Sequence, residues 1–417
     1  MKSTTYFEIA VFSIILTSLQ TPIGLCKPII HNKNQHVVRP AKSFIQWCQQ
    51  RKIVSKTIRN TIDVLLEKAG TKNCILANTR LQKFDEINIE SRNIVDIQPL
   101  ATFGNLLELN LRGNQIVDIQ PLANLHNLTR IDLNFNQVKD LTPLASLDKL
   151  NSLELDGNKI SDLQPLSGLN NLTQLWLNTN EITNIQPLSK LQNLELLQLT
   201  SNQVIDIKSL ASLTKLTKLV LDKNRINDIN SLSSLADLKL ISLDENRISN
   251  LQPLVKLKQL NDIRVNGNQI TTLISLAELT NLRSLELKNN QISDIMPLSS
   301  LNNLSSLELN DNQISNLNPL AKLKSLDSLH LRKNRISDIT PLSSLIFLHR
   351  LDLSGNQISN IKPLAALGEI DYLELNDNQI TDVSSLNGFS TSAFLNFINN
   401  KITTKKCPVQ PEYHCKF

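Results

Sequence analysis

Asparagine recurs at an unbroken interval of 22 residues over most of this 417-residue chain. Around each asparagine, apolar residues follow the pattern LxxLxLxxNxIxDIxPLxxL, with no insertion between repeats. A fixed period of this length is typical of a solenoid, in which each repeat packs only against its neighbours. The sequence therefore predicts one long coil rather than the two or three globular domains that its length alone suggests. The repeated asparagines are Asn114, Asn136, Asn158, Asn180, Asn202, Asn224, Asn246, Asn268, Asn290, Asn312, Asn334, Asn356, Asn378 and Asn400.

Each part of the repeat has a physical role. The alternation in Leu109 and Leu111 predicts a short strand that points both side chains inward, and successive strands should stack about 4.8 Å apart in one parallel sheet. We expect the asparagine amide to be buried, where it satisfies backbone groups at the turn. Proline or serine seven residues later suits a tight outer turn that begins a short helical segment. The predicted fold is an α/β solenoid, a curved right-handed coil with its parallel sheet on the concave face.

These motifs resemble the leucine-rich repeat proteins, and within them the 22-residue class found in bacterial internalins and in a eukaryotic protein phosphatase regulatory subunit. The resemblance covers residues 84–403, about 14 to 15 turns. Arg92 replaces asparagine in the first turn, as expected of an atypical terminal repeat. The preceding segment, with Trp47 and Cys48, also looks like the N-terminal flank of secreted bacterial proteins of this class. We see no LPxTG-type sorting motif and no immunoglobulin-like domain of the kind that follows the repeats in internalins, so we expect neither wall anchoring nor host-cell invasion from this resemblance.

The start of the chain is typical of a signal peptide, which we assign to residues 1–26. Lys2 precedes an apolar run over residues 9–19, and a Pro-x-Gly sequence follows before Cys26. The run is about half of the ~20 residues that a membrane span needs, so we expect cleavage and no transmembrane segment. Acylation of Cys26, as in a lipoprotein, is the alternative. The expected location is secreted, periplasmic or at the cell surface.

The four remaining cysteines flank the repeats in two pairs, with none inside the array. We expect the local disulfides Cys48–Cys74 and Cys407–Cys415, because the two pairs lie at opposite ends of an array at least ~60 Å long. Paired cysteines also fit an exported protein. A metal site is the rival interpretation, but neither pair has CxxC spacing, so no metal is expected.

Two flanking segments complete the predicted organisation. Residues 27–83 form a helical N-terminal cap, in which Ser55 begins an amphipathic helix that Gly70 ends. Residues 404–417 form a C-terminal disulfide tail. The cap segment carries 12 Lys or Arg against 2 acidic residues, but no basic run with interleaved aromatics is present, so no nucleic acid partner is expected.

Catalytic motifs are not found in the sequence. It has no P-loop, GxGxxG, HExxH or GxSxG, and its carboxylates recur once per turn as part of the repeat. Asp118 and its equivalents should cap free amides at a turn. We therefore expect neither enzymatic activity nor a cofactor.

Function should then depend on the strand residues that face outward, six, four, two and one positions before each asparagine. Four of them form an apolar patch over four consecutive turns, in a face that is otherwise polar: Trp176, Leu196, Val220 and Leu240. Lys218 and Arg264 belong to its charged rim. A large aromatic among aliphatic side chains with a charged rim is the composition of a protein-binding hot spot. The alternative is a chance scatter of single apolar residues.

A second candidate is a basic and aromatic strip that could hold an acidic partner or a sugar. It comprises His330, Arg332, Lys333, Arg350 and Tyr372. The preferred function is a secreted, monomeric recognition module that binds a protein on its concave face. The alternatives are an intracellular regulatory subunit of a phosphatase-like enzyme and a diffuse adhesive or structural surface protein.

Overall fold

Short parallel strands, each three residues or fewer, follow one another across a single sheet in chain order. The computed structural model describes residues 42–389, 392–410 and 414–417, so the predicted signal peptide lies outside the described residues. Within these ranges the sheet has sixteen strands. The strands are β1 Glu86–Asn88, β2 Glu108–Asn110, β3 Arg130–Asp132, β4 Ser152–Glu154, β5 Gln174–Trp176, β6 Leu196–Gln198, β7 Lys218–Val220, β8 Leu240–Ser242, β9 Asp262–Arg264, β10 Ser284–Glu286, β11 Ser306–Glu308, β12 Ser328–His330, β13 Arg350–Asp352, β14 Tyr372–Glu374, β15 Phe394–Asn396 and β16 Cys415–Lys416.

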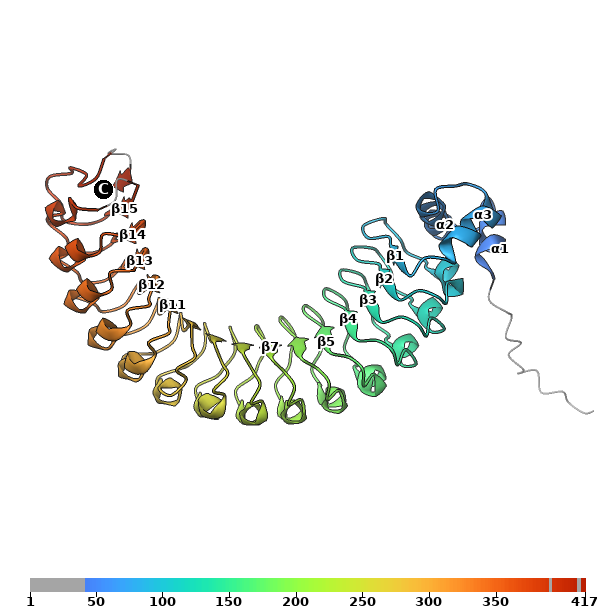
Figure 1. Cartoon of the computed structure of the whole chain (residues 1–417), viewed down its shortest axis with the longest axis horizontal. Helices are drawn as coiled ribbons and strands as arrows, with labels where there is room; N and C mark the ends of the chain where they lie inside the picture. The colour runs from blue at the N-terminus through green and yellow to red at the C-terminus, as the bar shows by residue number, and fades with distance from the viewer. Residues whose placement is uncertain (1–41, 390–391, 411–413) are drawn as a thin grey trace, which may run out of the picture. The chain divides into compact units, whose positions relative to one another are not determined.

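A short 3₁₀ helix forms the outer side of each of the first fourteen repeats. Proline is the second residue of ten of these fourteen helices. Figure 1 shows the strands along the inner side of the curved array and these helices along its outer side, as predicted. The helices are η1 Gln98–Thr102, η2 Gln120–Leu122, η3 Thr142–Leu144, η4 Gln164–Gly168, η5 Gln186–Lys190, η6 Lys208–Ser212, η7 Asn230–Ser234, η8 Gln252–Lys256, η9 Ile274–Leu276, η10 Met296–Ser300, η11 Asn318–Lys322, η12 Thr340–Ser344, η13 Lys362–Ala366 and η14 Ser384–Leu386.

The repeated asparagines form a ladder between turns, as the spacing predicts. The side-chain amide of Asn246 donates to the carbonyl oxygens of Leu243 at 3.1 Å and Leu221 at 3.0 Å. Its side-chain oxygen accepts from the backbone N–H of Ile226 at 3.0 Å. The same pattern recurs from Asn114 onward, so one side chain satisfies backbone groups of two successive turns.

Three helices cap the first turn: α1 Phe44–Gln49, α2 Lys56–Lys68 and α3 Cys74–Leu81. The helix from Ser55 to Gly70 was predicted, and Gly70 has the positive φ of 64° that a C-terminal cap requires. Helix α3 was not predicted, although Asn73 caps its N-terminus by accepting from two backbone N–H groups. No helix in the described ranges is long and apolar enough to span a bilayer.

Contacts between α2 and the first turn explain why that turn departs from the repeat. Arg92, at the asparagine position, forms an ion pair with Glu67 of α2. The side-chain hydroxyl of Thr61 donates to the Asp96 carbonyl at 2.6 Å, and the Asn60 amide donates to the Arg92 carbonyl at 2.9 Å. The cap thus occupies the backbone groups that a preceding repeat would otherwise satisfy.

Both local disulfides are present, Cys48–Cys74 and Cys407–Cys415, each with its Cα atoms 5.7 Å apart. The first joins α1 to α3. The second joins Cys407 to Cys415 of β16, which pairs with β15, so the predicted disulfide tail also contributes a strand to the sheet. The ring of Phe417 stacks on that of Phe397 with centroids 5.5 Å apart and closes the end of the core.

The acidic residues of the repeat cap turns, as expected. The Asp118 carboxylate accepts from the backbone N–H of Gln120 at 2.8 Å, and Asp140, Asp162, Asp206 and Asp228 make the equivalent bond. These side chains therefore have a structural role at the start of each outer helix.

Candidate functional site

The first and third residues of strands β5–β8 face the concave side, although Ser242, third in β8, is itself buried; the middle residue of each of these strands is buried. Parallel pairing places equivalent positions of successive strands side by side, which creates two columns along the array. The first column contains Leu196, Lys218 and Leu240, and the second contains Trp176, Gln198 and Val220. The apolar residues of the patch therefore alternate between the two columns from strand to strand. The other column position on each strand holds a polar residue, as with Gln198, Lys218 and Ser242.

The patch is less exposed than its sequence predicts. Trp176, Leu196, Val220 and Leu240 are all half-buried, whereas the prediction treated them as fully outward apolar side chains. Strands in a sheet lie about 4.8 Å apart, so each side chain is flanked closely by those of the neighbouring strands. What remains available to a partner is the outer part of one apolar side chain on each of β5–β8.

The two predicted rim residues differ in their surroundings. Lys218 is half-buried between Leu196 and Leu240 in the first column. Arg264 lies 3.3 Å from Asp262 and 3.4 Å from Glu286, and hydrogen bonding to Asp262 raises the pKa of its guanidinium. Arg264 is thus already paired within the chain, while Lys218 lies inside the patch rather than around it.

Acidic residues lie beside the second candidate strip, which stays a prediction. In the second column His330 lies between Glu308 and Asp352, and burial lowers the pKa of its imidazole. The Tyr372 hydroxyl donates to Glu374. The 22-residue spacing of Glu308, His330, Asp352 and Glu374 in the sequence is the signal for these acidic neighbours.

The members of that strip also occupy different parts of the surface. Arg350 and Tyr372 are exposed and adjacent in the first column, and the Tyr372 ring stacks on Phe394 with centroids 5.2 Å apart. Arg332 and Lys333 lie in the loop that follows β12, where Lys333 contacts Asp311 at 3.8 Å. The strip is therefore spread over two parts of the surface, and acidic residues lie beside His330, Lys333 and Tyr372.

A second ladder, which the sequence analysis missed, runs along the edge of the concave face. Two residues after a strand, an Asn or Asp oxygen accepts from a backbone N–H of the next turn; Asn134 and Asp156 both do so at 2.7 Å. Burial raises the pKa of Asp156, Asp222 and Asp244. The sequence signal for this second ladder was that Asn or Asp recurs two positions before the asparagine of the main ladder. Its members are Asn134, Asp156, Asn178, Asp222, Asp244, Asn266 and Asn310.

Phe135 is a second feature that the sequence analysis missed. It is 52% exposed and has a φ of 55°, in a position where other turns carry glycine or polar residues. The Arg112 guanidinium lies 4.6 Å from its ring centroid. A Cβ at Gly157 would lie 2.6 Å from the Phe135 ring, so glycine in the next turn makes room for the aromatic side chain. Gly157, one turn after Phe135, was therefore the sequence signal for a large side chain at position 135.

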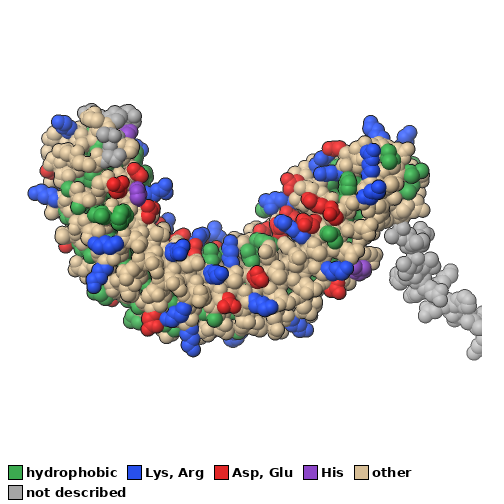
Figure 2. Space-filling model, in the orientation of Figure 1, with side chains coloured by type: hydrophobic (Ala, Val, Ile, Leu, Met, Phe, Trp, Pro, Cys, Tyr) green, Lys and Arg blue, Asp and Glu red, His purple; other side chains and the backbone are tan. Residues whose placement is uncertain are grey.

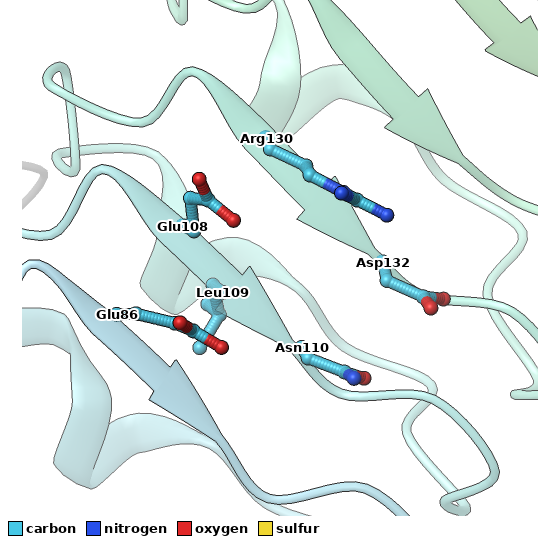
Figure 3. A pocket seen from close by; sticks show the side chains of 6 residues that line it. All are labelled: Glu86, Glu108, Leu109, Asn110, Arg130 and Asp132. Carbon is cyan, nitrogen blue, oxygen red and sulfur yellow. The ribbon is translucent and has the colours of Figure 1, made fainter.

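The first strands carry a shallow, mostly acidic depression. Glu86, Glu108, Asn110, Arg130 and Asp132 line it, as Figure 3 shows, and Figure 2 shows acidic side chains gathered over this part of the inner face. Arg130 pairs with a further carboxylate, since its guanidinium lies 2.8 Å from Glu154. No group of three or more His, Cys, Asp or Glu in the described part of the chain is arranged to hold a metal ion.

Comparisons with known proteins agree with this geometry. The family described as leucine-rich repeats (2 copies) matches residues 104–146, 148–190, 280–322 and 324–366. No curated protein matches the sequence. The solved structure of an internalin, InlF of Listeria monocytogenes, is 33% identical, with a TM-score of 0.74 over 76% of this chain and 95% of that chain.

Two further structures share the fold. A leucine-rich repeat protein of Leptospira interrogans is 24% identical, covering 78% of this chain and 93% of its own, with a TM-score of 0.68. A plant peptide hormone receptor, RGFR1 in complex with RGF2, is 19% identical, covering 76% of this chain and 64% of its own, with a TM-score of 0.57.

Proposed function

The chain belongs to the internalin-like leucine-rich repeat proteins, and from that premise we propose that it is a non-catalytic recognition module that binds a protein on its concave face. The observation that carries this proposal is the set of four half-buried apolar side chains, one on each of β5–β8, which includes Trp176. Aromatic and aliphatic side chains that are partly covered by neighbours lose little rotamer freedom on binding, which favours them as contact residues.

Rigidity of the scaffold supports the same proposal. The main asparagine ladder and the second ladder both follow the C-terminal ends of the strands and link successive turns on that side of the patch. A surface with fixed geometry binds without an ordering cost of its own. The plant receptor, whose structure contains RGF2, has the same fold and provides a precedent for peptide recognition by such an array.

We also propose that the protein acts outside the cytoplasm. The disulfides Cys48–Cys74 and Cys407–Cys415 support this location, since disulfides persist mainly in oxidising compartments. They weigh against an intracellular regulatory subunit. Cell fractionation combined with counting of free thiols tests this part of the proposal.

Affinity capture with the full chain as bait tests the binding function. The patch variant Trp176→Ser/Val220→Ser should lose captured proteins that the wild type retains. The matched control is Ile274→Ser/Met296→Ser, because these apolar residues are 72% and 53% exposed at the start of η9 and η10 on the outer side. Equal retention by wild type and patch variant would contradict concave-face binding and favour diffuse adhesion.

A further inference from the structure

We propose that the partner enters the apolar patch as an amphipathic α-helix whose axis crosses strands β5–β8, with an acidic side chain facing Lys218. This inference rests on the proposed function, because it specifies what the concave face binds. The register of strands β5–β8 and the positive charge of Lys218 inside the patch support it.

The spacing of the patch matches the pitch of a helix. One apolar side chain occurs on each strand, so consecutive anchors are separated along the array by the strand spacing of about 4.8 Å. An α-helix laid along this direction repeats every 5.4 Å. The mismatch of about 0.6 Å per strand accumulates to less than ~2 Å over the three steps from Trp176 to Leu240, which side chains can absorb.

An extended peptide fits the same anchors poorly. Its side chains on one face repeat every ~6.6 to 6.8 Å. The mismatch with the strand spacing is about 2 Å per step and about 6 Å over three steps, which exceeds one strand spacing. An extended segment that runs parallel to the strands instead meets only one or two of the four anchors.

The alternation between columns also favours a helix. Trp176 and Val220 lie in the second column, whereas Leu196 and Leu240 lie in the first, two residues away along the strands. The apolar stripe of a helix alternates from side to side in the same way, at spacings of three and four residues. Four strands span about 14 Å, so roughly ten residues of helix cover the patch.

Charge sets the remaining requirement on the partner. Lys218 lies in the first column between Leu196 and Leu240, half-buried among apolar neighbours. A helix that covers the patch removes more water from this ammonium group, which costs free energy unless an acidic side chain is supplied. The expected ligand therefore has apolar residues at i, i+3 or i+4, and i+7, with Asp or Glu beside them.

Selection from a library of random 18-residue peptides, displayed with their coding nucleic acid and panned against the full chain, tests this inference. Enriched peptides should show apolar residues with a period near 3.6, carry an acidic residue, and become helical on binding by circular dichroism. Their affinity should fall at least tenfold with Trp176→Ser, and with Lys218→Met only when the acidic residue is present. The Ile274→Ser/Met296→Ser variant should bind like the wild type.

Two other outcomes would overturn the inference in distinguishable ways. Enriched peptides that depend on Trp176 but have a period of two, or no period, would contradict the helix while leaving concave-face binding intact. Failure to enrich any peptide that distinguishes wild type from Trp176→Ser would contradict the helix, while affinity capture with the patch variant decides separately whether the concave face binds a protein.

Discussion

The side-chain oxygen of Asn246 accepts a hydrogen bond from the backbone N–H of Ile226, one turn earlier, at 3.0 Å. The same side chain donates to carbonyl groups of both turns, so its removal leaves buried donors and acceptors unpaired. We predict that Asn246→Ala lowers the free energy of unfolding by about 1 to 3 kcal/mol. Denaturant melts measure this difference.

Asn250 provides the matched control for that substitution. It is exposed and makes a single turn-capping bond with the Gln252 backbone N–H at 2.8 Å. Asn250→Ala should cost about 1 kcal/mol or less. If the two variants lose equal stability, the buried ladder is not the main polar link between turns.

Removal of the first disulfide should loosen one end of the array. The Cys48–Cys74 bridge spans 26 residues and the Cys407–Cys415 bridge spans 8. The chain-entropy relation gives about 3.5 and about 2.5 kcal/mol of stabilisation, respectively. In a solenoid each unit contacts only its neighbours, so Cys48→Ala/Cys74→Ala should raise hydrogen exchange first in the cap and in β1.

The C-terminal pair serves as the control for this local effect. Cys407→Ala/Cys415→Ala should raise exchange around β15 and leave the cap unchanged. An increase spread evenly along the array in either variant would show that the disulfides act on the whole coil.

Some non-glycine residues in the loops after the strands have a left-handed backbone conformation, which should lower stability. Phe135 and Thr179 occupy the same position in different turns, each with a φ of 55°, which costs about 1 to 2 kcal/mol for most residues and less for asparagine. Thr179→Asn should therefore stabilise the protein by about 1 kcal/mol. Phe135→Asn should gain less, because it also removes the Arg112 contact worth about 0.5 to 1 kcal/mol. Destabilisation by Thr179→Asn would be inconsistent with backbone strain at this position.

The concave face should also make stability depend on pH. Burial raises the pKa of Glu308 from 4.5 to about 7. Because the folded state holds this proton more tightly than the unfolded state, the contribution to stability is present below pH 4.5 and is lost as pH rises through about 7. Glu308→Gln should therefore be more stable than wild type at pH 8, by about 1 kcal/mol after allowance for partial solvent exposure.

Thermal melts of Glu308→Gln across this pH range measure the difference. It should vanish near pH 4, where the wild-type carboxyl is protonated. The matched control is Glu278→Gln, because Glu278 is exposed and hydrogen bonding to Lys258 lowers its pKa, so no gain at pH 8 is expected. Equal behaviour of the two variants would contradict the effect of burial.

Most of the fold was predictable from the repeat, because equivalent positions of the 22-residue period occupy equivalent places in successive turns. Features at the ends were not predictable in this way. The pairing of Arg92 with Glu67 and the strand formed by Cys415 and Lys416 depend on contacts between the array and its flanks. Such contacts have no counterpart within the period.

The candidate site was predictable in position but not in environment. The columns that contain Trp176 and Leu196 follow from the strand spacing, and the structure places both as expected. Their burial, and the shifted pKa of Glu308, depend on which side chains flank them on adjacent strands. The second ladder was missed because its residue type varies between Asn and Asp while its hydrogen bond does not.

The central claim is that Trp176 anchors a protein partner. Calorimetric titration of a captured partner into wild type and Trp176→Ala, with melting temperatures of both, tests it most directly. We predict an affinity loss of about 2 kcal/mol or more, roughly 30-fold, at a temperature where the melting curve shows Trp176→Ala to be folded, while Met296→Ala on the outer side changes neither affinity nor melting temperature. Unchanged affinity for Trp176→Ala, or a loss matched by Met296→Ala, would contradict the account.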